Sequence, residues 1–162
     1  MSEVTFCSEP FGRILEEIKP LLSLHWSENA NHQDKVPLDP NWAAYEHLES
    51  IGVMEAIAAR DEDNRLVGYY ISSVLPHPHY RSTLYSFNDV YFLLPEYRTA
   101  ANGIKLFVCY EESMLARMKR DGYDKIVLIG RARFPHDPGK ILKRLGWELA
   151  ETVWTKLLET EI

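Results

Sequence analysis

The hydrophobic pattern is clearest between Ser86 and Gly122, where it predicts a strand, a polar turn and a long helix. Ser86–Leu94 is rich in aromatic and β-branched residues, which are typical of strands. Pro95 ends the strand because it has no N–H to donate to a ladder. Apolar residues then recur at helical spacing until Asp121 and Gly122 close the helix; they are Ile104, Phe107, Val108, Leu115 and Met118.

The N-terminal part of the pattern predicts a short strand and two helices. Val4–Ser8 reads as the strand, and Ser8 is a candidate N-cap with Pro10 in the first turn of a helix. Pro20 is expected to kink or end this helix, because proline lacks a backbone donor. Asn41 is expected to cap the second helix, which ends near Gly52. The inward residues are Phe11, Ile14, Leu15, Ile18 and Leu22 in the first helix, and Trp42, Tyr45 and Leu48 in the second.

Strand-like segments follow on both sides of the long helix. Val53–Arg60 and Leu66–Leu75 are joined by a polar hairpin connection, and Pro76–Ser82 reads as a loop. Lys125–Gly130 is continuously apolar, which suits a strand buried on both faces and parallel to the one before Pro95.

The C-terminal part predicts a short helix at Gly139–Leu145 and a final strand at Trp147–Leu158. The fold class that this order indicates is α/β. It has a central mixed sheet, a right-handed parallel crossover through the long helix, and flanking helices.

Size and composition indicate one domain over residues 1–162. Hydrophobic residues make up 46% and charged residues 26%, which is ordinary for a globular protein. No apolar run approaches the roughly 20 residues of a membrane helix. The N-terminus lacks the features of a signal peptide, so a cytoplasmic location is expected. Cys7 and Cys109 are too few for a disulfide framework and are expected to be reduced core thiols.

The charge is unevenly distributed. Nine of the 18 Lys and Arg residues lie between Arg117 and Arg144 with three aspartates, so this segment carries +6 and the remainder −12. The basic segment suits the anionic end of a cofactor, and the acidic remainder suits a cationic substrate. A solvated face explains the same charges equally simply. Nucleic acid is not an expected partner, because the chain is acidic and its basic residues are not interleaved with aromatics.

The turn Arg98–Gly103 is a candidate anion site. It is small and polar and leads into a helix, whose first N–H groups have no helical partner and lie at the positive end of the macrodipole. Such a turn can hold a pyrophosphate with backbone groups alone. An ordinary strand–turn–helix connection is the alternative reading.

The segment Pro95–Leu106 resembles the acetyl-CoA loop of the GNAT superfamily of N-acetyltransferases. In that loop, Gln/Arg-x-x-Gly-x-Gly/Ala precedes a long helix; Arg98 and Gly103 match its ends, and Ala101 replaces the middle glycine. If this position needs a positive φ, a Cβ costs about 1–2 kcal/mol. Arg144–Trp147 resembles the family's turn before its last strand, so the likeness covers about Val4 to Leu158. Leu38–Trp42 and His77–Tyr80 also resemble members carried by phages and prophages.

The resemblance implies an acetyl-CoA-dependent N-acetyltransferase that acetylates a primary amine of a small cationic molecule or a protein. Acetyl-CoA is then the co-substrate, no metal or membrane is involved, and a homodimer is possible. Candidates for the nucleotide phosphate are Arg131, Arg133, Lys140, Lys143 and Arg144. The implied cofactor-binding residues are Phe92, Leu93, Leu94, Arg98, Thr99, Ala100, Ala101, Asn102, Gly103 and Ile104.

Asp89 is the candidate catalytic base, acting directly or through a water. It lies six residues before Pro95, where the resembled family often carries Glu, and burial would have to raise its pKa. A role in a local turn or an ion pair is the alternative. The resembled family often places a Tyr acid where this chain has Leu142. Tyr80 or His79 is the candidate substitute, and a rigid turn of packed rings is the alternative.

The segment Leu24–Gln33 is expected to line the acceptor side, with Trp26, Glu28 and His32 as substrate-binding residues. His25, Glu28 and His32 would share a face if the segment were one helix, which makes a zinc site conceivable. No metal is predicted, because the spacing does not match H-E-x-x-H and no fourth ligand is in view.

Two other functions stay open. A non-catalytic relative that binds an acyl-CoA or a protein partner is favoured by Ala101 and Leu142. A small acidic interaction protein without any cofactor is the other.

Overall fold

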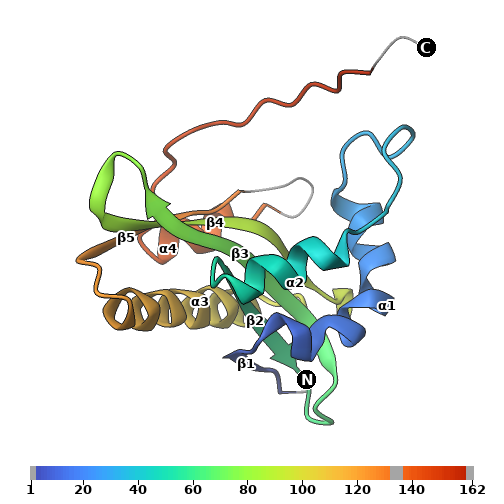
Figure 1. Cartoon of the computed structure of the whole chain (residues 1–162). Coiled ribbons are helices and arrows are strands. Elements are labelled where there is room, and N and C mark those ends of the chain that lie inside the picture. Colours follow the sequence, from blue (N-terminus) through green and yellow to red (C-terminus); the bar gives the residue numbers. More distant parts are fainter. Residues whose placement is uncertain (1–2, 132–136, 160–162) are drawn as a thin grey trace.

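A computed structural model describes residues 3–131 and 137–159. Within them lies one mixed sheet with the strand order β1-β2-β3-β4-β5 and helices on both faces (Figure 1), which confirms the predicted fold class. The strands are β1 (Thr5–Ser8), β2 (Met54–Arg60), β3 (Leu66–His77), β4 (Tyr80–Leu93) and β5 (Lys125–Ile129). The helices are α1 (Phe11–Asn29), α2 (Trp42–Ser50), α3 (Ala100–Arg120) and α4 (Gly139–Arg144), with a 3-10 turn η1 (Pro95–Tyr97) before α3.

The sheet separates two cores. Strands β1 to β4 pair antiparallel, and β4 pairs parallel with β5 through the predicted crossover. On one face, α1 and α2 cover Tyr69 and Phe92; on the other, α3 and α4 cover Tyr70. Both helical layers therefore meet β3 and β4, which carry the candidate site.

Three predictions for the helices need correction. Ser8 does not cap α1; Glu49 of α2 accepts from the N–H groups of Phe11 and, at 3.0 Å, Gly12. Pro20 does not end α1, because it lies on the exposed side, where water can reach the carbonyl that loses its partner. In α3, Leu115 is 46% exposed, and the buried stripe consists of Leu106, Phe107, Tyr110, Met114 and Arg117.

Two predicted segments also differ. Pro76–Ser82 is not a loop, since β3 reaches His77 and β4 begins at Tyr80, so a tight hairpin joins them. The final strand does not form: residues 148–159 extend away from the sheet (Figure 1), with Trp154 91% exposed, and Glu159 pairs with Lys35 at 3.0 Å. A strand has no hydrogen bonds of its own, so an alternating pattern specifies one only where a partner edge is reached.

The cysteines are not core residues. Cys7 is exposed on β1 and Cys109 is half-buried on α3. Burial raises the pKa of Cys109 to about 11, so this thiol stays protonated at neutral pH. Within the described residues, no helix is both long and apolar enough to cross a membrane.

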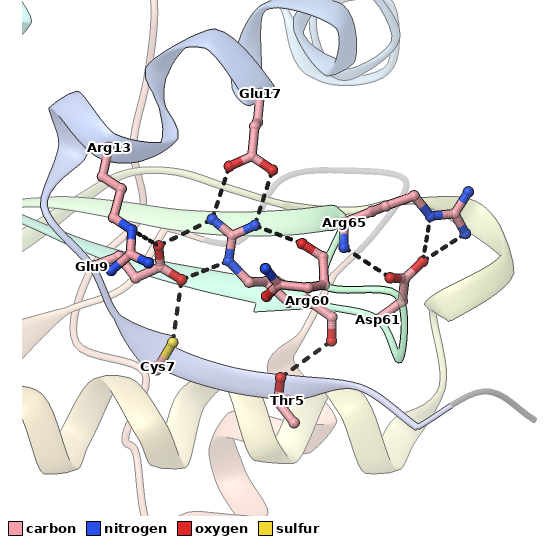
Figure 2. Close-up of polar contacts among 9 residues, drawn as sticks. Thr5, Cys7, Glu9, Arg13, Glu17, Arg60, Asp61 and Arg65 are labelled. Carbon is pink, nitrogen blue, oxygen red and sulfur yellow. Dashed lines mark hydrogen bonds and ion pairs between the residues drawn. The ribbon is translucent and has the colours of Figure 1, made fainter.

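An arginine buried between two glutamates joins β1, α1 and the β2–β3 hairpin (Figure 2). Arg60 Nε donates to Glu9 at 2.7 Å, and its terminal nitrogens donate to Glu9 at 3.0 Å and to Glu17 at 2.8 and 2.9 Å. The remaining donor reaches the Asn64 carbonyl at 3.0 Å, so all five guanidinium donors are used. These bonds hold the first turns of α1 on the edge of the sheet.

The charges in this cluster change one another's ionisation. Hydrogen bonds from Arg60 lower the pKa of Glu9 and Glu17, and both carboxylates raise the pKa of Arg60. A carboxyl whose folded pKa is depressed adds stability above its unfolded pKa, about 4.3, and that stability is lost as the pH falls through the folded value.

We expect Arg60→Met to lower the free energy of unfolding by about 3–5 kcal/mol at pH 7, because it leaves buried Glu9 with no cation closer than the exposed Arg13, at 3.6 Å. Urea denaturation followed by circular dichroism measures this. The loss should shrink as the pH is lowered below about 4.3, since protonated Glu9 no longer needs the cation.

Lys19→Met is the matched control, because it removes a cation from an exposed pair on α1. Its cost should stay within about 1 kcal/mol. Equal costs for the two variants, or a cost for Arg60→Met that does not depend on pH, would contradict this account of the cluster.

Candidate active site

The site begins where the two parallel strands part. β5 pairs with β4 only from Thr83 to Phe87, while β4 continues to Leu93. Buried Asn88 marks the point of separation, and its side-chain oxygen accepts from the Arg131 N–H at 2.5 Å. A crevice between diverging parallel strands at their carboxyl ends is where α/β sheets bind ligands.

Beyond this point, β4 has backbone groups that β3 does not use. The Leu94 N–H donates to the Val67 carbonyl at 2.8 Å. Because antiparallel ladders alternate, Tyr91 and Leu93 direct their backbone groups to the side that β5 has left. An extended ligand arm can add there as a strand would. The N–H of Leu94, one of the implied cofactor-binding residues, is already bonded to β3.

Arg98 fastens the turn that follows β4. Its Nε donates to the Leu93 carbonyl at 2.7 Å, and a terminal nitrogen pairs with Glu28 of α1 at 2.6 Å. Its guanidinium also lies 5.3 Å from the centre of the Phe92 ring. Arg98 therefore positions the loop between α1 and β4, a role that its place in the loop pattern did not reveal.

The N-terminus of α3 is arranged as predicted for an anion site. Thr99 is the N-cap and accepts from the Asn102 N–H at 3.1 Å, while the Asn102 side chain donates to the Tyr97 carbonyl at 2.9 Å. Ala100 and Ala101 are the first helical residues, and the geometry of a helix leaves their N–H groups without an intrahelical acceptor. Two amides at the positive end of α3 can thus meet a phosphate.

Neither Ala101 nor Gly103 adopts the left-handed backbone conformation, which needs a positive φ. Ala101 lies in the first turn of α3, and among the described residues only His32 and Asn64 combine a side chain with a positive φ. The strain considered for Ala101 therefore does not arise. At Gly103, a Cβ would lie 2.7 Å from Ile141 Cδ1, so this glycine lets α4 pack beside the start of α3.

Asp89 is the extra residue of a β-bulge. Ser72 pairs with Asn88 and Ile71 with Val90, which leaves Asp89 without a partner on β3. Its carboxylate accepts a hydrogen bond from the Tyr45 hydroxyl of α2 at 3.1 Å. The side chain is exposed, so the predicted burial of Asp89 is not present.

Tyr45 was missed as a site residue because its helical position indicated only packing. Its ring stacks on Phe11, with centroids 5.1 Å apart, and its hydroxyl reaches Asp89. Burial, and then the charge of Asp89, raise the pKa of Tyr45 to about 12. At neutral pH it is a proton donor to the carboxylate.

The structure does not bring Tyr80 and His79 to this site. They lie at the tip of the β3–β4 hairpin, where Tyr80 is 53% exposed and packs against His77 and Tyr85. Nine residues of extended strand separate Tyr80 from Asp89, or about 30 Å. These residues form the turn of packed rings that was the alternative interpretation. Neither Tyr80 nor His79 can act on a group held at Asp89.

The three residues expected on the acceptor side have different positions. Trp26 lines a pocket of about 310 Å³ bounded by α1, α2 and the segment between them. Glu28 pairs with Arg98 instead, and His32 is exposed beyond the end of α1. Because α1 ends at Asn29, His25, Glu28 and His32 do not share a helical face, and no group of three potential metal ligands occurs within the described residues.

Of the basic residues proposed for the nucleotide phosphate, only some lie near the start of α3. Lys140, Lys143 and Arg144 are exposed on α4, which packs beside that helix end, and Arg131 is exposed after β5. Arg133 is outside the described residues. Leu142 is half-buried against the core under α3, so this side chain packs where the resembled family often has its acid.

Similar folds occur among solved structures. A ribosomal-protein-alanine N-acetyltransferase from Brucella melitensis biovar Abortus 2308 is 23% identical, with a TM-score of 0.57 over 98% of this chain and 100% of that chain. An aminoglycoside acetyltransferase from an uncultured soil metagenomic sample, in complex with sisomicin, is 14% identical, with a TM-score of 0.62 over 98% and 96%. The chain has the GNAT acetyltransferase fold.

A third structure carries a ligand that spans both substrates. AAC(6')-Iy, in complex with the bisubstrate analog CoA-S-monomethyl-acetylneamine, is 17% identical, with a TM-score of 0.58 over 98% of this chain and 100% of that chain. No protein-family model matches the chain, and neither does any curated protein sequence. The likeness to the GNAT fold is therefore one of structure.

A glycine on β3 keeps the open part of β4 in place. Gly68 pairs with Leu93, and a Cβ there would lie 2.5 Å from the Phe92 carbonyl oxygen and 2.4 Å from Leu93 Cδ2. The Phe92 carbonyl oxygen belongs to the backbone, so it cannot avoid the added Cβ by a side-chain rotation. The sequence predicted Gly68 only as part of a strand and gave no sign of this close approach between β3 and β4.

We expect Gly68→Ala to lower the free energy of unfolding by about 1–3 kcal/mol, because β4 must shift to admit the methyl group. Thermal and urea unfolding measure the loss. Gly12→Ala is the control, since its Cβ would meet only the end of the Glu49 side chain, at 3.3 Å. A Gly68→Ala variant as stable as wild type would refute this contact.

Proposed function

We propose that the chain is an N-acetyltransferase that moves an acetyl group from acetyl-CoA to a primary amine. One observation carries the proposal: past the point where β5 leaves it, β4 carries the Asp89 bulge and then backbone groups that β3 does not use, and it leads through η1 into the unpaired amides of α3. The GNAT fold supports it. The acetyltransferases with this fold include proteins named for ribosomal-protein alanine and for aminoglycoside acceptors.

The residues present fit coenzyme A. On the side of β4 that β5 has left, the backbone of Tyr91 and the N–H of Leu93 face the place where an extended pantetheine arm would add as a strand, while the Leu93 carbonyl already accepts from Arg98. The N–H groups of Ala100 and Ala101 then meet the pyrophosphate, and the exposed Lys140, Lys143 and Arg144 are candidates for the nucleotide phosphate. Arg98 acts by holding this loop in place.

Asp89 receives the acceptor's ammonium group and takes its proton, directly or through a water. The neutral amine then forms the new C–N bond at the acetyl carbon, the C–S bond breaks, and the nitrogen gives up its second proton, which the departing thiolate can take. A thiol has a pKa near 8.5, so the sulfur can leave as a thiolate. The absence of a tyrosine at Leu142 is therefore compatible with the reaction.

The single domain over residues 1–162, the cytoplasmic location, the phage-associated type and a homodimer remain predictions from the sequence. They are independent of the proposed reaction.

We expect Ala101→Glu to weaken acetyl-CoA binding at least about tenfold, because a carboxylate then opposes the pyrophosphate at the start of α3. The same charge is favourable for a helix N-terminus, so the fold should be kept. Isothermal titration calorimetry with acetyl-CoA measures the change, and circular dichroism checks the fold.

Ala116→Glu, near the other end of α3, is the matched control and should bind acetyl-CoA like wild type. If both variants bind equally well, the phosphate does not lie at the start of α3. If wild type itself gives no heat with millimolar acetyl-CoA, the proposed function fails.

We expect Asp89→Asn to lower kcat/KM for an amine by about 10²-fold or more, while leaving acetyl-CoA affinity unchanged. The remaining activity should rise more steeply with pH, because only amine that is already neutral can react. Thiol release followed from pH 6 to 9 measures both effects.

Asp63→Asn, on the exposed β2–β3 hairpin, is the control and should behave like wild type. An Asp89→Asn variant with an unchanged rate and pH profile would remove Asp89 as the base. Acetyl-CoA binding without thiol release on any amine would favour the non-catalytic binding module instead.

A further inference from the structure

The pocket beside Asp89 has a chemical character that the proposed reaction does not require. It measures about 310 Å³ and lies between α1, α2 and the residues that join them. Its floor is the sheet, through Tyr69, Ile71 and Val90. Asp89 is outside the lining, but the lining residue Tyr45 donates to its carboxylate at 3.1 Å, so the carboxylate lies one hydrogen bond from the pocket.

The walls of this pocket are aromatic and aliphatic. Trp26 and Trp42 face it from the two helices, and Leu22 adds an aliphatic wall from α1. The segment between the helices adds Val36 and Leu38, which are 44% and 37% exposed. Large apolar side chains left accessible around one hollow mark a site for an apolar ligand.

Few polar groups line the pocket. Among the described lining residues, Asp39 is the single carboxylate, and no lysine or arginine takes part. The buried His25 ring is already engaged, with its Nδ1 2.7 Å from the Tyr69 hydroxyl. The hydroxyl of the lining residue Tyr45 donates to Asp89, so a second negative charge lies one hydrogen bond beyond the lining.

From this distribution we infer that the acceptor is a primary amine on an apolar body, such as an arylalkylamine. The inference rests on the proposed acetyl transfer and narrows its acceptor. The ammonium lies at Asp89, and the ring or alkyl group lies between Trp26, Trp42 and Leu22. A polyhydroxylated or polycationic acceptor would lose water from several polar groups, and these walls provide a single carboxylate, Asp39, to pair with them.

The test compares three amines with one protein: 2-phenylethylamine, spermidine and the aminoglycoside sisomicin. We expect kcat/KM for 2-phenylethylamine to exceed both others at least about tenfold, a ratio of the size that apolar pocket contacts give. Equilibrium binding of each amine, measured by calorimetry in the presence of coenzyme A, should follow the same order. This second measurement does not depend on turnover.

Leu22→Asp places a charge in the wall and should lower the affinity for 2-phenylethylamine at least about tenfold. Leu115→Asp is the matched control, because Leu115 is exposed on α3 and outside the pocket. Acetyl-CoA binding should be the same in both variants, which shows that both have folded.

The outcomes separate this inference from the proposed function. If spermidine or sisomicin is acetylated as well as 2-phenylethylamine, or better, the inference is wrong and the acetyl transfer stands. If 2-phenylethylamine binds wild type but not Leu22→Asp and no amine is acetylated, the proposed function is wrong and the assignment of the pocket stands. If 2-phenylethylamine does not bind at all, the inference is overturned.

Discussion

The parting of β4 and β5 is the constraint on which the rest of the structure depends. Parallel pairing stops at Phe87, and the Asn88 side chain holds the β5 end at the point of separation. The bulge at Asp89 follows at once, and it turns a carboxylate toward the α1–α2 face. One irregularity in one strand thus exposes backbone on one side and places a charged group on the other.

Buried and half-buried ion pairs keep the surroundings of this opening in place. Arg60 holds the start of α1 on the sheet through Glu9 and Glu17, and Arg98 holds its last turn against the end of β4 through Glu28. Because α1 is fastened at both ends, it serves as a fixed wall for the apolar pocket. The helix therefore links the stability of the fold to the shape of the candidate acceptor site.

The sequence predicted those features that depend on residues close together in the chain, such as helix caps and apolar runs. Asn41 caps α2 as expected, Thr99 starts α3 beside the predicted turn, and β5 pairs parallel with β4 as its apolar run predicted. The same run wrongly predicted burial on both faces, since Val127 is 38% exposed. Contacts between distant segments were beyond such reasoning: Glu49 supplies the cap of α1, and Glu28 neutralises the arginine of the loop. The strand predicted at Trp147–Leu158 does not form for the same reason, since a strand needs a partner edge that the sequence does not specify. Tyr45 and the bulge at Asp89 appear only once β3 and β4 are set in register.

The most direct test of the account is the change in backbone amide NMR shifts when coenzyme A is added to the ¹⁵N-labelled protein. The account predicts that the largest changes fall on two stretches, the amides of Ala100–Asn102 and those of Val90–Leu93, on opposite sides of η1. Changes confined to the hollow between β1 and the later turns of α3, lined by Cys109 and Glu112 among others, would contradict it.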